Sequence, residues 1–250
     1  MLRTIAAAAV LAALSLVWSS PAQAGTGADR TIAKMTAHYR DPTLEVQNKP
    51  FALLYLRTTE GMRAANAEGE FSDPAFWDSA VIPTFAAYYL DAYAAWKRGD
   101  EEHVPPAWRI AFQARADRLT CTQLIYLGIN AHVNNDLAFV IDDLGPRYTY
   151  ADHKHVDDVL AHRVGPVVYP EIQRDLCPDL FADPVPATAD RDIDAWRQLA
   201  WENAQRLRHA PDEKSRRVVA KQIRRHARDK AHEILRWNLD PPTAEGAGQR

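Results

Sequence analysis

Apolar residues recur every three or four positions along almost the whole chain, which is the spacing of one face of an α-helix. The alternation of apolar and polar residues that marks a half-buried strand is weak throughout. The pattern predicts an all-α protein, a multi-helix bundle of about seven or eight helices that ends in a C-terminal helical pair. The helices are expected at residues 30–40, 51–67, 75–98, 105–117, 120–143, 153–175, 191–209 and 213–237.

Proline-containing segments punctuate this pattern. The proline-rich stretch FADPVPATAD, residues 181–190, is the best candidate for an internal boundary. It separates a helical bundle domain over residues 25–180, with a central polar site, from the C-terminal pair over residues 190–238, which could pack on the bundle or stand apart. The end of the chain, PPTAEGAGQR, is poor in apolar residues, so residues 239–250 are expected to be disordered.

The first residues have the three parts of a secretory signal: the basic Arg3, the apolar core IAAAAVLAALSLV, and the small residues Ala22 and Ala24. The apolar run is shorter than the roughly 20 residues that a bilayer span needs. We therefore expect residues 1–24 to be a signal peptide that is cut after Ala24. The protein should then be secreted or periplasmic, with no transmembrane anchor.

The formal net charge is −3, which is nearly neutral for a chain of 250 residues. This balance argues against general binding to polyanions, and we expect no nucleic-acid partner. The two cysteines, Cys121 and Cys177, could pair in an oxidising compartment or remain separate buried thiols, because the sequence does not give the distance between them. Neither cysteine lies in a motif that would activate a thiol.

The stretch GINAHVNNDL, residues 128–137, places polar side chains inside an otherwise apolar helix. Residues three and four apart share a helix face, so His132 and Asp136 lie on the apolar stripe. Asn130 and Asn134 fall together on a neighbouring face. Burying these groups without partners would cost several kcal/mol each, so they need hydrogen-bond partners or a ligand.

Two other helices are expected to bring an acid inward. Glu60 follows the apolar stripe of its helix, and Asp91 follows Tyr88 on the stripe of another. The segment DHKHVDD adds Asp152 as a helix cap and Asp157 in the first turns. Helical bundles that hold metals build their sites in this way, with carboxylates and a histidine on facing helices.

These positions define a candidate site for a divalent metal ion such as zinc, manganese or iron. In a metal-dependent hydrolase of esters or phosphoesters, one carboxylate would activate a metal-bound water. The candidate catalytic residues are His132, Asp136 and Glu60, the metal ligands are these three and Asp91, and the supporting residues are Asn130, Asn134, Asp152, Asp157, Tyr55 and Tyr88.

Two other interpretations remain open. The polar groups could form a hydrogen-bond network that fixes helix packing and binds nothing. Alternatively, a metal-free pocket could hold a small or lipid-like ligand, or use His132 as a general base that Asp136 or Glu60 orients. The sequence contains no Gly-x-Ser-x-Gly, His-Glu-x-x-His or Gly-x4-Gly-Lys motif, which disfavours the enzyme classes that depend on them. An enzyme site should face a solvent-connected cavity, whereas a structural network should be sealed.

The succession of FALLYLRTTEGM, FSDPAFWDSAVIPTFAAYYLDAY, PPAWRIAF and GINAHVNNDLAFVI resembles a bacterial helical family, domain-of-unknown-function family 5995. The resemblance spans about residues 45–175 and centres on an Asn-Ala-His-Ile-Asn-x-Asp-Leu signature, which runs here from Asn130 to Leu137. It implies a common polar centre around His132 and Asp136. It implies no reaction, because the family has no established activity, and it leaves out the C-terminal pair.

The last expected helix is strongly basic on one side over residues 214–237. This side could be a solvated outer face, or it could make weak contact with an anionic surface such as a membrane. The contact would weaken with salt, because salt screens exposed charges.

Overall fold

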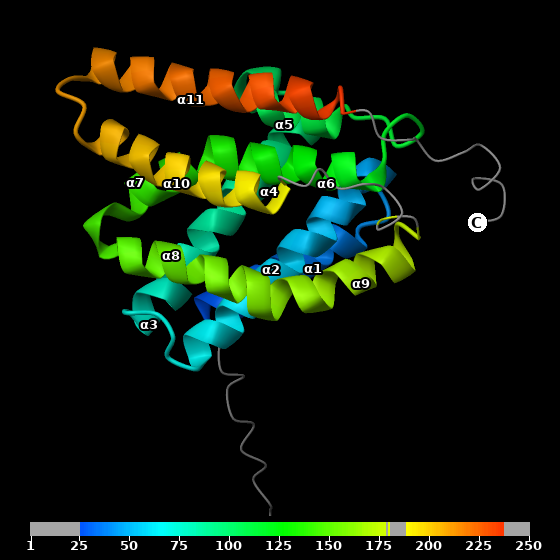
Figure 1. Cartoon of the computed structure of the whole chain (residues 1–250), viewed down its shortest axis with the longest axis horizontal. Helices are drawn as coiled ribbons and strands as arrows, with labels where there is room; N and C mark the ends of the chain where they lie inside the picture. Colours follow the sequence, from blue (N-terminus) through cyan, green and yellow to red (C-terminus); the bar gives the residue numbers. More distant parts are fainter. Residues whose placement is uncertain (1–25, 179, 181–188, 238–250) are drawn as a thin grey trace, which may run out of the picture.

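The computed structural model describes residues 26–178, 180 and 189–237, and every regular element in these ranges is helical (Figure 1). The predicted all-α bundle is confirmed. The expected signal peptide, most of the 181–190 loop and the expected tail over 239–250 lie outside the described residues. Within the described ranges, no helix combines the length and the apolar character that crossing a membrane requires.

The helices lie close to where the apolar spacing predicts them. The three longest predictions before the C-terminal pair each contain a short π-helical segment, in which hydrogen bonds run from residue i to i+5. These segments are η2 (Trp77–Val81), η4 (Ala131–Asp136) and η6 (Leu160–Val164). The α-helices are α1 (Gly27–Arg40), α2 (Lys49–Ala67), α3 (Pro74–Phe76), α4 (Ile82–Lys97), α5 (Pro106–Phe112), α6 (Cys121–Asn130), α7 (Leu137–Leu144), α8 (Tyr150–Val159), α9 (Gly165–Asp175), α10 (Ala189–Arg208) and α11 (Glu213–Ile234).

Short polar side chains and glycines set several helix ends. Thr120 begins α6 with a capping box, in which its hydroxyl accepts from the Gln123 amide while the Gln123 side chain accepts from the Thr120 amide. Gly99 follows α4 with a φ of 71°, a conformation that favours glycine. The helix predicted over 105–117 ends early, at Phe112, because the charged and alanine residues beyond it bury no large apolar side chain.

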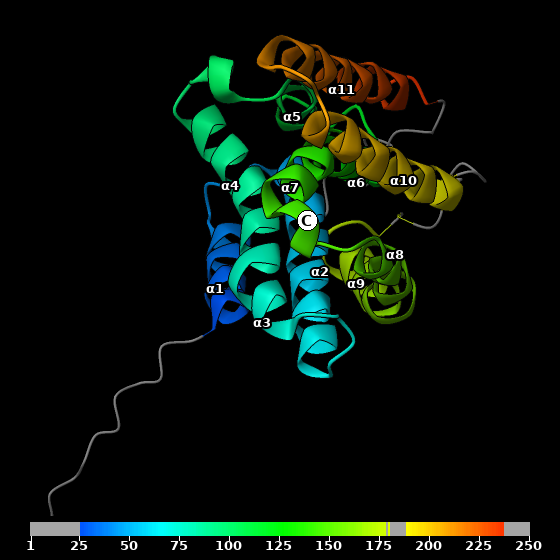
Figure 2. The ribbon, with the colours of Figure 1, turned by 90° about the vertical axis from the view of Figure 1, so that its left-hand side faces the viewer.

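Helix α2 lies at the centre of the molecule. Figure 2 shows α1 and α4 on one side of it and α8 and α9 on the other, and α2 contacts all four. Arg57 of α2 donates two hydrogen bonds of 2.6 and 2.5 Å to Glu171 of α9, which fixes this side of the bundle. The C-terminal pair, α10 and α11, forms an antiparallel hairpin that packs on α5, α7 and η4 (Figure 1).

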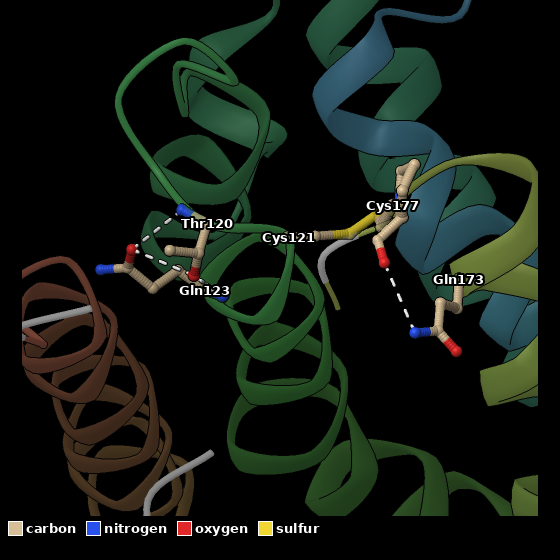
Figure 3. The surroundings of a disulfide bond; sticks show 6 residues. Thr120, Cys121, Gln123, Gln173 and Cys177 are labelled. Atoms are coloured by element: carbon tan, nitrogen blue, oxygen red, sulfur yellow. Dashed lines mark hydrogen bonds between the residues drawn. A yellow bond between two sulfur atoms is a disulfide. The ribbon is translucent and has the colours of Figure 1, made fainter. Parts of the chain in front are cut away.

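A disulfide joins Cys121, the first residue of α6, to Cys177 beyond the end of α9, with a Cα–Cα distance of 6.0 Å (Figure 3). The bridge closes 56 residues of chain, and loop closure of this length contributes about 4 kcal/mol on the chain-entropy model. Figure 3 also shows the Thr120–Gln123 cap beside it. The Gln123 side chain donates a 2.9 Å hydrogen bond to the carbonyl of Ile234, so the start of α6 is tied to both α9 and α11.

Candidate functional site

The predicted stripe on α6 and η4 buries His132 and Asp136 together, at 7% and 1% exposure. Nδ1 of His132 lies 3.2 Å from Oδ2 of Asp136. The same oxygen accepts a 2.8 Å hydrogen bond from the Trp108 indole, and Oδ1 accepts one of 2.7 Å from the side-chain amide of Asn135. Since donors meet both oxygens, the carboxylate acts as an acceptor and Nδ1 of His132 carries the proton. In the neutral form of the ring, Nε2 then presents a lone pair.

Nε2 of His132 is buried and has no hydrogen-bond partner among the described residues. His132 lines a cavity of about 810 Å³, and this nitrogen is the imidazole's remaining polar atom. Aromatic rings surround the imidazole: Tyr55 lies 4.4 Å away, Phe85 5.9 Å and Phe51 6.2 Å between ring centroids. Burial raises the pKa of Tyr55 well above its usual value, so its hydroxyl stays neutral. Besides the Tyr55 hydroxyl, the histidine is therefore the polar group of this aromatic wall.

Most of the cavity wall is apolar, and about half of the residues that line it come from α2, η6 and α9. Its side chains include Leu54, Met62, Val164, Val168 and Tyr169. The exposed residues around the cavity are Asp158, Ala161, Pro166, Pro170 and Asp194, so the cavity opens to solvent beside α8, η6, α9 and α10.

Asp157 and Arg197 line the cavity near this opening. The Arg197 guanidinium is 4% exposed, forms an ion pair with Asp157 through Nε, and donates a 2.7 Å hydrogen bond from Nη2 to the carbonyl of His153. Lys154 adds a 2.6 Å contact to Asp157. Burial alone would raise the pKa of Asp157, but the two cations outweigh it and hold this pKa below its usual value. The charges of Arg197 and Asp157 are thus already paired with each other.

All three π-helical segments meet at the cavity. Because π-helices make up well under about 1% of residues in globular proteins and occur frequently at functional sites, this coincidence marks the cavity as a specialised region. The side chains that they contribute are Trp77 and Val81 from η2, His132 and Val133 from η4, and Leu160, Ala161 and Val164 from η6.

The predicted acids from α2 and α4 do not reach this site. Glu60 is half-exposed and accepts a 2.8 Å hydrogen bond from Arg57 on the outside of α2. Asp91 is exposed to solvent. Tyr88 points elsewhere and donates a 2.6 Å hydrogen bond to Asp143. The expectation that these three residues face inward is wrong, because the buried stripes continue one position away.

The burial pattern shows how each stripe runs. On α2 the buried face continues from Leu56 to Thr59, one residue before the predicted acid. On α4 the buried face passes through Tyr89 and Ala92, and Tyr88 lies at the edge of this face. Both neighbouring positions satisfy the three-or-four spacing, so periodicity alone could not choose between them.

The predicted metal-ligand set is therefore not assembled. Within the described residues, no group of three or more His, Cys, Asp or Glu side chains is placed to hold a metal ion. His132 and Asp136 touch each other, but Glu60 and Asp91 point away from them. Metal sites need three or four convergent ligands, so this donor set does not fit a metal centre.

The asparagines of the same stretch face α11. Asn130 donates a 2.8 Å hydrogen bond to the carbonyl of Ala227, and Asn134 donates one of 2.9 Å to the side-chain oxygen of Asn130. The amide oxygens of Asn134 and Asn135 have no partner in the described part of the chain, but neither residue lines the cavity. These amides hold the C-terminal pair to the bundle, and they do not support the pocket as we expected.

Asp152 also has a structural role that differs from the predicted cap. Thr149 caps α8, and Asp152 lies one turn further along. Its carboxylate accepts hydrogen bonds from the amide and hydroxyl of Ser72, at 3.0 and 2.5 Å, and from the Trp77 indole at 3.3 Å. It ties the segment before α3 to α8.

Sequence reasoning missed two residues that shape the site. Trp108 supplies a buried donor to Asp136, and a buried indole always requires such an acceptor. Arg197 lies on the apolar stripe of α10 between Ile193 and Ala200, and this charged residue on a buried face was a readable signal. The partner of each donor lies on another helix, which the local pattern does not identify.

Comparisons with known proteins give one family. A model of the family of unknown function DUF5995 matches residues 28–237. The match runs through α10 and α11, so the predicted span of about 45–175 was too short and the C-terminal pair lies inside the family's span. No curated protein and no solved structure matches the chain. Since the family model covers most of its length, the chain belongs to the family of unknown function DUF5995.

Proposed function

We propose that the protein binds a small apolar molecule in the cavity between α2, η6 and α9, and that His132 meets the polar group of that molecule. The observation that carries this proposal is the open Nε2 of a buried histidine in the wall of a cavity of about 810 Å³. Buried polar atoms are almost always hydrogen-bonded, so an unpartnered one in a side chain that lines a cavity favours a ligand. The volume lies within the roughly 300–1,000 Å³ of small-molecule sites.

The three π-helical segments support the same site. An α-helix would satisfy the local sequence with better hydrogen-bond geometry, and the chain departs from it three times around one cavity. Ordinary core packing requires no such departure.

A second candidate function is hydrolysis of an apolar ester without a metal. His132 and Asp136 have the arrangement of a general base and its orienting acid. Nε2 would take a proton from water as the hydroxide adds to the acyl carbon, and the departing alkoxide would take that proton back. The metal-dependent form of the predicted hydrolase has no support in the placement of the acids.

Export from the cytoplasm is also a proposal. The N-terminal sequence has the layout of a secretory signal, and a disulfide is typical of proteins that fold in an oxidising compartment. N-terminal sequencing of the protein from culture medium or periplasm would test this export, with a new N-terminus at Gly25 as the expected result.

Titration with the uncharged apolar dye N-phenyl-1-naphthylamine tests the binding proposal. We expect one saturable site per chain in the protein with its disulfide intact. Leu160→Trp fills the cavity from η6 and should lose most of this binding. Val167→Trp, at an exposed position of α9 away from the cavity, is the matched control and should bind as the wild type does. Non-saturable binding, or equal binding by both variants, would overturn the proposal.

Hydrolysis of 4-nitrophenyl esters of increasing chain length tests the second candidate. General-base catalysis predicts that His132→Gln lowers the rate about 100-fold. His209→Gln, at an exposed histidine, should leave it unchanged. Equal rates in the two variants would remove the catalytic candidate and leave the binding proposal intact.

A further inference from the structure

We infer that the ligand's polar group is an uncharged hydrogen-bond donor, a hydroxyl attached to an apolar chain or ring system, and that this hydroxyl donates to Nε2 of His132. The inference rests on the proposed function and adds the chemical class of the ligand. It follows from the hydrogen bonds behind the histidine, from the charges around the cavity and from the number of acceptors that the wall offers.

The hydrogen bonds behind the ring decide which nitrogen accepts. Trp108 and Asn135 can only donate to Asp136 through their N–H groups, so the carboxylate has no need of a proton of its own. The Nδ1 contact at 3.2 Å then places the imidazole proton on Nδ1. Nε2 is left as an acceptor, and a ligand that meets it must donate.

The charges disfavour an anionic head group. A carboxylate at Nε2 would stand one imidazole away from the buried Asp136, where low polarity strengthens the repulsion. Among the described residues around the cavity, Arg197 is the cationic one, and it already engages Asp157 and the His153 carbonyl. A fatty acid would therefore bring a charge that finds no free partner.

The acceptor count disfavours an ammonium group. An ammonium has three N–H donors, whereas the wall of Phe51, Tyr55 and Phe85 around the ring offers two acceptors, Nε2 and the Tyr55 hydroxyl oxygen. Stripping the water from the ammonium would leave one donor without a partner, at a cost of about 1–3 kcal/mol. A hydroxyl has one donor, which Nε2 alone satisfies.

The two ends of the cavity differ in burial, and this difference sets the direction in which the ligand binds. His132 is buried, whereas Asp158 and Asp194 at the opening are exposed. The hydroxyl end therefore enters first, and the apolar body lies along the side chains of α2, η6 and α9.

Displacement of N-phenyl-1-naphthylamine by a matched C12 series tests this inference. The competitors are 1-dodecanol, its methyl ether, dodecanoate and dodecylammonium. We expect dodecanol to bind about tenfold more tightly than the ether, which has the same chain and oxygen but no donor. Dodecanoate and dodecylammonium should also bind more weakly than the alcohol. This comparison uses the unmodified protein, so it does not depend on any variant folding.

A substitution then assigns the preference to one residue. His132→Phe should lose the preference for the alcohol over the ether. His209→Phe, the same change at an exposed histidine, should keep it. Equal affinity for alcohol and ether, tighter binding of dodecanoate, or a preference that persists in His132→Phe would overturn the inference while the binding proposal stands. Failure of the dye itself to bind would overturn the proposed function.

Discussion

Two buried histidines of this protein, His132 in η4 and His153 in α8, differ in what their second nitrogen meets. The ring of His153 is 1% exposed, with Nε2 3.1 Å from the carbonyl of Arg197 and Nδ1 3.4 Å from the Tyr148 hydroxyl. The ring of His132 is nearly as buried and lines the cavity, but its Nε2 has no partner in the described chain. Burial alone therefore does not distinguish a structural histidine from a candidate ligand-binding one. The open nitrogen does.

The signature stretch repeats this contrast within seven residues. Asn130 holds α11, whereas His132 faces the cavity. Residues two apart on a helix point to nearly opposite sides, since successive side chains are about 100° apart. The hydrogen-bonded asparagines and the histidine that lines the cavity thus lie on two sides of one helix.

The largest change in the free energy of unfolding is expected when Asp136, which contacts His132, is replaced. Asp136→Leu leaves the donors of Trp108, Asn135 and His132 buried without an acceptor, so the free energy of unfolding should fall by about 3–5 kcal/mol. Urea denaturation measures it. Asp91→Ala, at the exposed acid, should change it by less than about 0.5 kcal/mol. A loss below about 1 kcal/mol for Asp136→Leu would contradict the three hydrogen bonds.

The buried and hydrogen-bonded His153 should make the stability of the protein depend on pH. Burial and the nearby Arg197 guanidinium lower the pKa of His153 to about 3, whereas the unfolded residue titrates near 6.5. Between these values the unfolded chain binds the extra proton, so stability falls as pH drops from 6.5 towards 3 and is fully present above 6.5.

The slope from this one group is at most about 1.4 kcal/mol per pH unit, or about 3 kcal/mol between pH 6.5 and pH 4. Urea denaturation at several pH values should show a flatter dependence for His153→Gln than for wild type. Parallel curves would show that His153 is not held neutral.

The asparagine side of the signature should affect stability but not binding. Asn130→Leu removes the donor to Ala227 and the acceptor for Asn134, so we expect a loss of about 1–3 kcal/mol in the free energy of unfolding. Dye affinity should stay within about twofold of wild type, because Asn130 does not line the cavity. A large loss of dye affinity in the folded variant would mean that the two sides of the helix are coupled.

Replacing His132 should affect ligand binding and have the smallest effect on stability, which is the opposite of what we expect for Asn130. His132→Phe removes one of three donors to Asp136 but fills the aromatic wall, so we expect the free energy of unfolding to change by about 1 kcal/mol or less. Thermal unfolding with and without dodecanol measures it. The alcohol should raise the melting temperature of wild type by more than that of the variant. Stabilisation of both proteins alike would refute the contrast between the histidines.

The fold could be predicted largely because the apolar spacing is local. Each expected helix corresponds to one described helix or to a composite of two. The π-helical segments could not be predicted, since an i+5 hydrogen bond leaves the three-or-four spacing of side chains such as Ile129 and His132 almost unchanged. The early end of α5 depends on how little the following residues bury, which is a tertiary property.

The candidate site was predictable only in its centre. The pair His132 and Asp136 lies on one helix, four residues apart, so local geometry identifies it. The other walls come from helices whose rotation about their axes depends on packing, and neighbouring residues such as Tyr88 and Tyr89 satisfy the same spacing. An aromatic run gives no means of choosing the inward residue.

The π-helical segments decide where the chain tolerates the loss of a residue. Each holds one residue more than an α-helical turn, so removing one residue from η6 would restore an α-helical repeat while α9 keeps its orientation about its axis. The same deletion in the first turns of α9 would rotate the residues beyond it by about 100° and take Glu171 away from Arg57. Two single-codon deletions a few residues apart should thus differ in effect without changing the hydrophobicity of the sequence, a difference that substitution scanning does not reveal.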